Sequence, residues 1–104
     1  MNWYSSMYLS DSVRARAGQL MKEMEEERFS RRIWVLSIPL CERDQLDIRR
    51  ASSLAYHGLW ETIPMIVGLA GSRMEAVELV QQIARDCMAT RGDASLREYL
   101  TGTR

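Results

Sequence analysis

Several residue types and patterns are scarce in this sequence. The 104-residue chain has one histidine, two cysteines and two prolines, and its fourteen basic and fourteen acidic residues leave a formal net charge of zero. The lack of a basic excess argues against nucleic acid as a partner, because phosphate contacts dominate the affinity of nucleic-acid-binding proteins. No apolar run approaches the ~20 residues that span a bilayer, so we expect no membrane partner.

The scarcity of histidine and cysteine also limits the chemistry. Cys41, His57 and Cys87 show no spacing typical of a metal site, and no nucleophile motif occurs. We therefore predict no metal, no cofactor and no catalytic residue, and lean toward a protein that is not an enzyme. The opening segment lacks the basic start and apolar run of a signal peptide. With two widely separated cysteines, this predicts a cytoplasmic protein with reduced thiols.

Apolar patterns are present and predict the fold. The runs Ile33–Leu40 and Ile63–Ala70 predict strands covered on both faces. Pro39 indicates that the first strand ends there or lies at an edge of the sheet. An apolar stripe of period 3.6 predicts a helix from Asp11 to about Arg28, and a second helix follows the second strand and ends near Gly92. A short helix, ASLREYL, comes last. These elements predict one α/β domain over residues 1–104.

The segment 46–62 is ambiguous. Leu46 and Ile48 alternate with Asp47 as in a short strand, whereas Ile48, Ala51 and Ala55 have helical spacing. We favour a short strand, a turn at Ser52 and Ser53, and an irregular or briefly helical segment after it. The expected order is therefore helix, strand, short strand or turn, strand, helix and short helix.

The first nine residues, MNWYSSMYL, are rich in aromatic side chains. Trp3 and Met7 are four residues apart, as are Tyr4 and Tyr8, which is the spacing of neighbours on one or two helix faces. One interpretation is that the rings pack onto the body of the domain. The other is an interface or binding lip, because Trp and Tyr are enriched in interface hot spots.

The sharpest motif is the glycine corner between the second strand and the helix that follows it. A strand, a glycine turn and a helix form many phosphate sites. Gly68 and Gly71 permit close backbone approach, and Ser72 and Arg73 begin the helix, where an anion would lie. Ser72 and Glu75, however, form an S-x-x-E capping box, which explains the corner without a ligand.

Five segments carry a resemblance that covers nearly the whole chain. They are WYSSMYLSDSVRARAGQLMKEM, RRIWVLSIPL, LDIRRASSL, IPMIVGLAGSRMEAVELVQQI and GDASLREYL, in this order. Together they resemble a family of small, uncharacterised bacterial proteins of about 100 residues. The resemblance implies a compact cytosolic α/β domain, and it implies no activity, cofactor or catalytic residue.

Two functions are compatible with these patterns. The first is a non-catalytic protein-interaction module that self-associates, as a homodimer, or binds another protein. The second is a small-ligand, phosphate or nucleotide-binding protein that uses the corner at residues 68–73. Nucleic-acid binding would require Arg31, Arg32, Arg49 and Arg50 to gather on one face.

Overall fold

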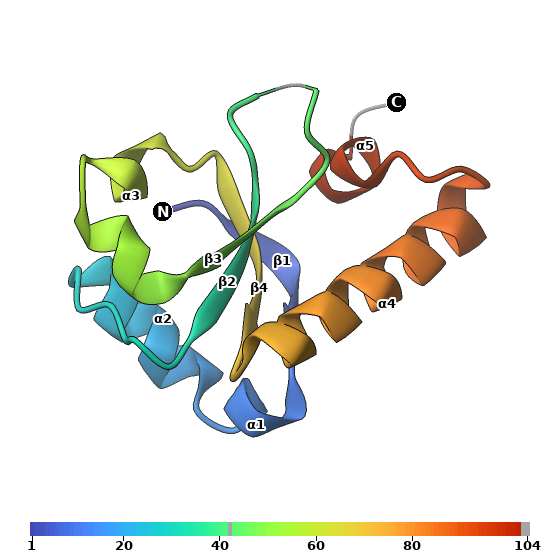
Figure 1. Ribbon diagram of the computed structural model, residues 1–104. Coiled ribbons are helices and arrows are strands. Elements are labelled where there is room, and N and C mark those ends of the chain that lie inside the picture. Colours follow the sequence, from blue (N-terminus) through green and yellow to red (C-terminus); the bar gives the residue numbers. More distant parts are fainter. Residues whose placement is uncertain (42, 103–104) are drawn as a thin grey trace.

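A computed structural model describes residues 1–41 and 43–102 of the chain. It shows a small α/β domain with a four-stranded mixed sheet between two layers of helices (Figure 1). The elements, in chain order, are β1 (Trp3–Leu9), α1 (Asp11–Arg14), α2 (Ala17–Glu25), β2 (Trp34–Ile38), β3 (Asp47–Arg50), the 3-10 helix η1 (Ala51–Ala55), α3 (Leu59–Thr62), β4 (Met65–Ala70), α4 (Arg73–Arg91) and α5 (Leu96–Thr101).

The strands lie in the order β1-β4-β2-β3. β1 runs parallel to β4, whereas β2 is antiparallel to both β4 and β3. β1 and β3 are therefore the two edges of the sheet, and both run in the direction of β4. The two long predicted strands are neighbours, and their pairing is antiparallel.

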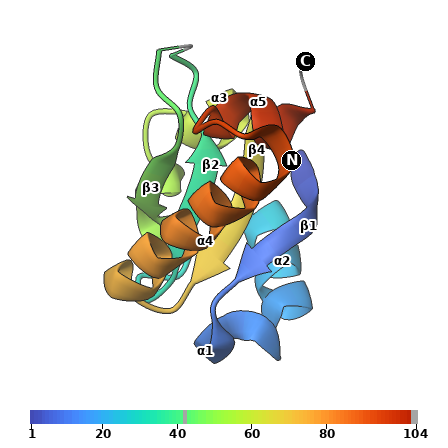
Figure 2. The same cartoon turned by 90° about the vertical axis from the view of Figure 1, so that its right-hand side faces the viewer.

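Each face of the sheet carries its own core. In β2, Val35 packs with α2, η1 and α3, whereas its neighbour Leu36 packs with α4 and α5. This alternation follows from the two-residue period of a strand. α2 and α3 cover one face and α4 crosses the other (Figures 1 and 2). The prediction of strands buried on both faces is thus confirmed.

The first nine residues differ from the expected helical spacing. They form edge strand β1, with Trp3 and Met7 packed on the α2 side and Tyr4 and Tyr8 on the α4 side. A spacing of four places two residues on one face of a strand as well as of a helix, so it does not separate the two structures. Aromatic residues also favour strands, and pairing with β4 decides the outcome.

The predicted helix from Asp11 to Arg28 is also interrupted. α1 ends at Arg14 and α2 begins at Ala17, with Arg16 in a non-helical conformation between them. α1 is tied to the sheet because the Ser10 amide donates to the Leu69 carbonyl at 3.1 Å and Val13 is fully buried. The chain must then change direction for α2 to lay its own apolar face on the sheet, and this packing overrides helix propensity.

The ambiguous segment matches the favoured interpretation. β3 is a four-residue strand, and η1 and α3 are the brief helical turns that follow it. The helix after the second strand is α4, and it ends as predicted at Gly92, whose φ of 80° is the left-handed conformation that glycine tolerates best.

Candidate functional site

The glycine corner joins β4 to α4, and close packing explains both of its glycines. Gly68 lies within β4, where a Cβ atom would come within 2.8 Å of the Tyr8 carbonyl oxygen. A Cβ atom on Gly71 would collide with the Ser12 hydroxyl. Neither glycine has a positive φ, so space and not conformation favours glycine here. The constraint is stricter at Gly68, where the close neighbour is backbone, than at Gly71, where it is a serine side chain.

Two backbone amides of the corner are already bonded to side chains of the protein. The Gly71 amide donates to Ser10 Oγ at 3.1 Å, and the Glu75 amide donates to Ser72 Oγ at 3.1 Å. In a capping box the glutamate side chain also accepts from the amide of the serine. The Glu75 side chain instead accepts from the hydroxyls of Ser72 and Ser12. The Ser12 hydrogen bond lowers the pKa of Glu75 and keeps it charged.

This geometry disfavours an anion at the corner. A phosphate would compete with Ser10 and Ser72 for the amides and would meet the Glu75 carboxylate. Arg73 is exposed at the start of α4. The prediction of ligand binding by Gly68, Gly71, Ser72 and Arg73 therefore gains no support from the structure.

The predicted interface residues separate onto two faces. The Trp3 indole donates to Glu25 at 2.7 Å, and its ring lies 6.2 Å from that of Trp60. Trp3 thus packs with α2 and α3. Tyr4 and Tyr8 point to the opposite face, where their rings are nearly parallel, with centroids 6.2 Å apart.

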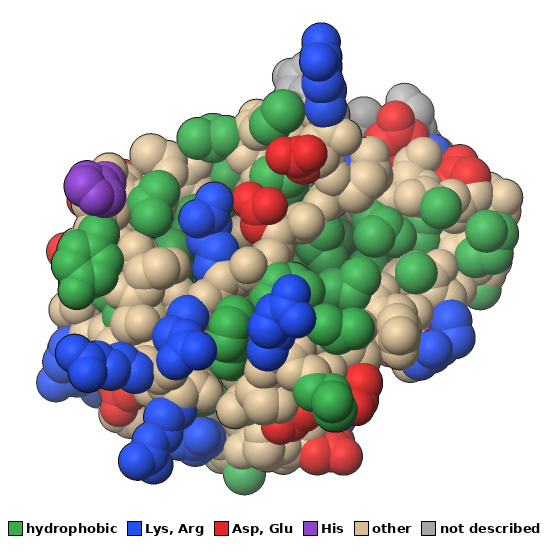
Figure 3. All heavy atoms as spheres, in the orientation of Figure 1, with side chains coloured by type: hydrophobic (Ala, Val, Ile, Leu, Met, Phe, Trp, Pro, Cys, Tyr) green, Lys and Arg blue, Asp and Glu red, His purple; other side chains and the backbone are tan. Residues whose placement is uncertain are grey.

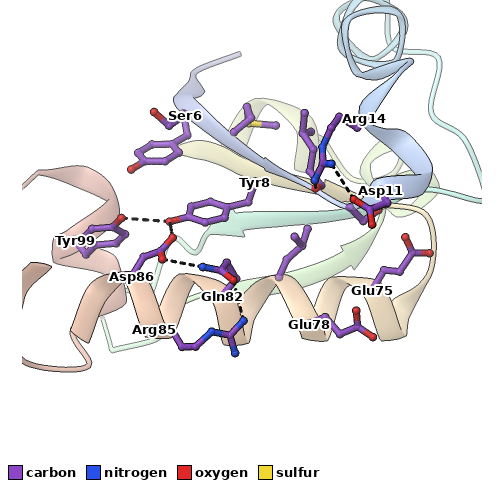
Figure 4. Close-up of a pocket in the computed structure, with 15 residues that line it drawn as sticks. Ser6, Tyr8, Asp11, Arg14, Glu75, Glu78, Gln82, Arg85, Asp86 and Tyr99 are labelled. Atoms are coloured by element: carbon purple, nitrogen blue, oxygen red, sulfur yellow. Dashed lines mark hydrogen bonds and ion pairs between the residues drawn. The ribbon is translucent and has the colours of Figure 1, made fainter. Parts of the chain in front are cut away.

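Tyr4 and Tyr8 form one wall of a groove of about 870 Å³ between β1 and α4. α1 closes one end of this groove with Asp11 and Arg14, and Tyr99 of α5 lies at the other end (Figure 4). Met7 also lines the groove. The structure therefore brings Tyr4 and Tyr8 to one concave surface, whereas Met7 borders it from β1 with its side chain packed on the α2 side of the sheet.

A chain of hydrogen bonds organises the tyrosine end of the groove (Figure 4). Tyr8 donates to Asp86 Oδ2 at 2.6 Å, and Gln82 donates to the other oxygen of Asp86 at 2.8 Å. The Tyr99 hydroxyl lies 3.3 Å from that of Tyr8. Because Tyr8 has one proton and gives it to Asp86, Tyr99 is the donor in this pair. The Arg85 guanidinium donates to the side-chain oxygen of Gln82 at 2.8 Å.

The tyrosines are held in their neutral form. Burial is the main cause that raises the pKa of Tyr8, and the hydrogen bond to Asp86 raises it further. Burial, followed by the nearby Tyr99, raises the pKa of Tyr4. A phenol that does not ionise serves as an aromatic surface and a hydrogen-bonding group, not as a base at neutral pH.

Acidic side chains outnumber basic ones in the lining of the groove. Four carboxylates, those of Asp11, Glu75, Glu78 and Asp86, face two arginines, a formal excess of two negative charges. Asp11 is paired with Arg14 at 2.9 Å. Glu78 is exposed, and no hydrogen bond or ion pair joins it to another described residue.

Sequence reasoning missed the α4 wall. Glu78, Gln82 and Asp86 recur every four residues and so occupy one face of a helix. This polar stripe is a usable signal, but on a surface helix it is also the ordinary solvent face. Only the position of β1 beside α4 makes it part of a groove.

Other chemistry-bearing residues lie elsewhere. Cys41 and His57 are exposed and do not line the groove, and Cys87 is a buried free thiol. Within residues 1–41 and 43–102, no three His, Cys, Asp or Glu side chains come close enough to hold a metal ion. None of the helices in this part of the chain is both long and apolar enough to cross a membrane.

Comparisons with protein-family models, with curated proteins and with solved structures found no match to this chain. The resemblance to a bacterial family therefore stays a prediction.

Proposed function

We propose that this protein is a small protein-interaction module that acts by binding and not by catalysis. Its binding site is the groove between β1 and α4, and its ligand is a positively charged polypeptide segment. The proposal extends the expected interaction module and replaces the corner at residues 68–73 as the site. It includes a cytoplasmic location, which two free cysteines support.

The observation that carries the proposal is the combination of aromatic and acidic groups in one groove. Tyr4 and Tyr8 present ring faces, which attract guanidinium and ammonium groups. Asp86 and the unpaired Glu78 supply carboxylates within the same groove. An arginine side chain suits such a surface, since it can stack on a ring and donate to a carboxylate together.

The shape of the groove favours a segment of chain over a small molecule. β1 is an edge strand, so one side of its backbone is available to pair with an added strand. The exposed Ser5 and Ser6 lie in the middle of β1, where its pairing with β4 shifts register between Trp3 and Tyr8, and their small side chains offer little steric hindrance. An extended peptide would thus place alternate side chains between Tyr8 and α4.

A peptide titration followed by amide NMR tests the proposal. A blocked tri-arginine peptide should shift the amides of β1 and of α4 between Glu78 and Asp86, and the shifts should weaken with salt. A blocked tri-glutamate peptide is the matched control and should leave these amides unchanged. Equal shifts from both peptides, or shifts only outside the groove, would refute the proposal.

A further inference from the structure

The opposite edge of the sheet, β3, carries Arg49 and Arg50, which point to opposite faces of the sheet, and Arg31 and Arg32 lie in the segment before β2. We call these four residues the arginine cluster. Figure 3 shows Lys and Arg side chains gathered around β3, which faces the viewer. Arg50 pairs across the strands with Trp34, and its guanidinium lies 4.8 Å from the centre of the Trp34 ring. It also donates to the carbonyl of Arg31 at 3.4 Å, which brings the two ends of the cluster together.

Most of this cluster lacks a counter-charge. Arg49 is 3.5 Å from Asp47, a long pair at the edge of the sheet. No carboxylate of the described residues pairs with Arg31, Arg32 or Arg50. The neutral chain thus has its charges divided, with unpaired arginines at the β3 edge and an acidic excess at the β1 edge.

One molecule cannot join its own two edges. β1 and β3 are separated by β4 and β2, three strand spacings or about 14 Å, and α4 crosses between them (Figure 2). Any pairing of the arginine cluster with the groove must therefore be made between molecules.

The sheet topology allows this pairing directly. β1 and β3 both run in the direction of β4, so a second copy placed alongside in the same orientation brings its β3 against β1 as a parallel pair. In this arrangement the relevant side chains of β3 and β1 also lie on the same face of the joined sheet. Ile48 and Arg50 lie on the α4 side of β3, as Tyr4 and Tyr8 do on β1.

We propose that the ligand of the groove is the β3 edge of a second copy of this chain, with Arg50 entering between Tyr8 and Glu78. This inference rests on the proposed function and names its partner. The contact joins two different surfaces, so each added copy leaves one groove and one arginine edge free. Self-association is therefore head-to-tail and starts with a dimer that can grow.

A competing explanation gives the arginines a protective role. Charged side chains on an edge strand often prevent sheets from pairing. A polyanion such as single-stranded nucleic acid is another occupant for the arginine cluster. Both alternatives predict that the groove plays no part in what the β3 edge does.

Sedimentation velocity over a concentration series tests the inference. The wild-type protein should form dimers and longer species that dissociate as salt is raised. Arg50→Glu removes the arginine from the edge and Ser6→Trp fills the groove at an exposed position, so each should weaken association by about tenfold or more. Arg43→Glu makes the same charge change at an exposed site in the loop between β2 and β3 and should leave association unchanged.

Mixing the two defective variants gives the decisive result. Arg50→Glu keeps the groove and Ser6→Trp keeps the edge, so a mixture should form one-to-one dimers and stop there. Wild-type protein that stays monomeric, or association that Arg50→Glu leaves intact, would overturn the inference. So would a 20-nucleotide single-stranded DNA that binds the arginine cluster while protein self-association is absent.

The peptide titration separates failure of this inference from failure of the proposed function. If the protein is monomeric but its groove binds tri-arginine, the function stands and the partner is a different basic protein. If tri-arginine also fails to bind, the proposed function fails as well. Circular dichroism of each variant confirms that the fold is retained.

Discussion

Tyr8 donates a 2.6 Å hydrogen bond to Asp86, a residue 78 positions further along the chain. This bond joins edge strand β1 to α4 at the tyrosine end of the groove. It fixes the ring that we expect to contact the ligand, and it restrains an edge strand that has one neighbouring strand. The same bond therefore contributes to stability and to the shape of the site.

Removal of this bond should destabilise the domain. Tyr8→Phe keeps the ring but leaves Asp86 with Gln82 as its hydrogen-bond donor, so the free energy of unfolding should fall by about 1–2 kcal/mol. Urea denaturation measures the change. Tyr56→Phe removes a hydroxyl from an exposed ring and should alter stability by less than about 0.5 kcal/mol. Equal effects of both variants would contradict the role of the bond.

Stability should also depend on alkaline pH through Tyr8. Its pKa is raised in the folded protein, so above pH ~10 the unfolded chain loses this proton while the folded protein keeps it. The free energy of unfolding should therefore fall as the pH rises beyond ~10. Tyr8→Phe should flatten this fall, as measured by urea denaturation between neutral pH and about pH 11. An unchanged slope in the variant would count against the assignment.

The glycine corner should respond to added volume. Gly71→Ala places a methyl group against Ser12, and we expect a loss of about 1–3 kcal/mol from this overpacking. A second change, Ser12→Ala, should recover part of the loss, which a double-mutant cycle would measure as coupling. Gly18→Ala is the matched control, because a Cβ at Gly18 in α2 meets no atom within 4 Å. Helix propensity predicts a gain of roughly 0.5–1 kcal/mol there.

The corner should act as a cap and not as an anion site. Ser72→Ala removes the acceptor for the Glu75 amide and should cost about 1 kcal/mol of stability. Inorganic phosphate should leave the amide shifts of residues 68–75 unchanged. Saturable shifts at these amides would instead identify the corner as a ligand site for phosphate.

The sequence predicts the central strands and α4 well, for a physical reason. β2 and β4 are covered on both faces, so their residues must be apolar almost without interruption. The Gly92 cap is a local feature and is also readable. These signals depend on residues that are near one another in the chain.

The groove can be predicted only in part. The aromatic residues of β1 mark Tyr4 and Tyr8 as candidates, but their spacing alone does not separate a strand from a helix. Tyr8 bonds to Asp86 and Tyr99, which lie 78 and 91 residues further along the chain. No local sequence pattern specifies contacts over such separations. The arginine cluster likewise forms because antiparallel pairing sets Arg50 beside Trp34.

The most direct measurement is an amide NMR experiment on a mixture of two variants. The Arg50→Glu protein, labelled with ¹⁵N and retaining its groove, is titrated with unlabelled Ser6→Trp protein, which retains its arginine edge. Head-to-tail binding predicts shifts in β1 and along the Glu78–Asp86 face of α4, with β3 unchanged. Reversing the label should move the shifts to β3 and the residues before β2. Shifts at the same edge in both experiments, or none in either, would contradict head-to-tail binding through the groove.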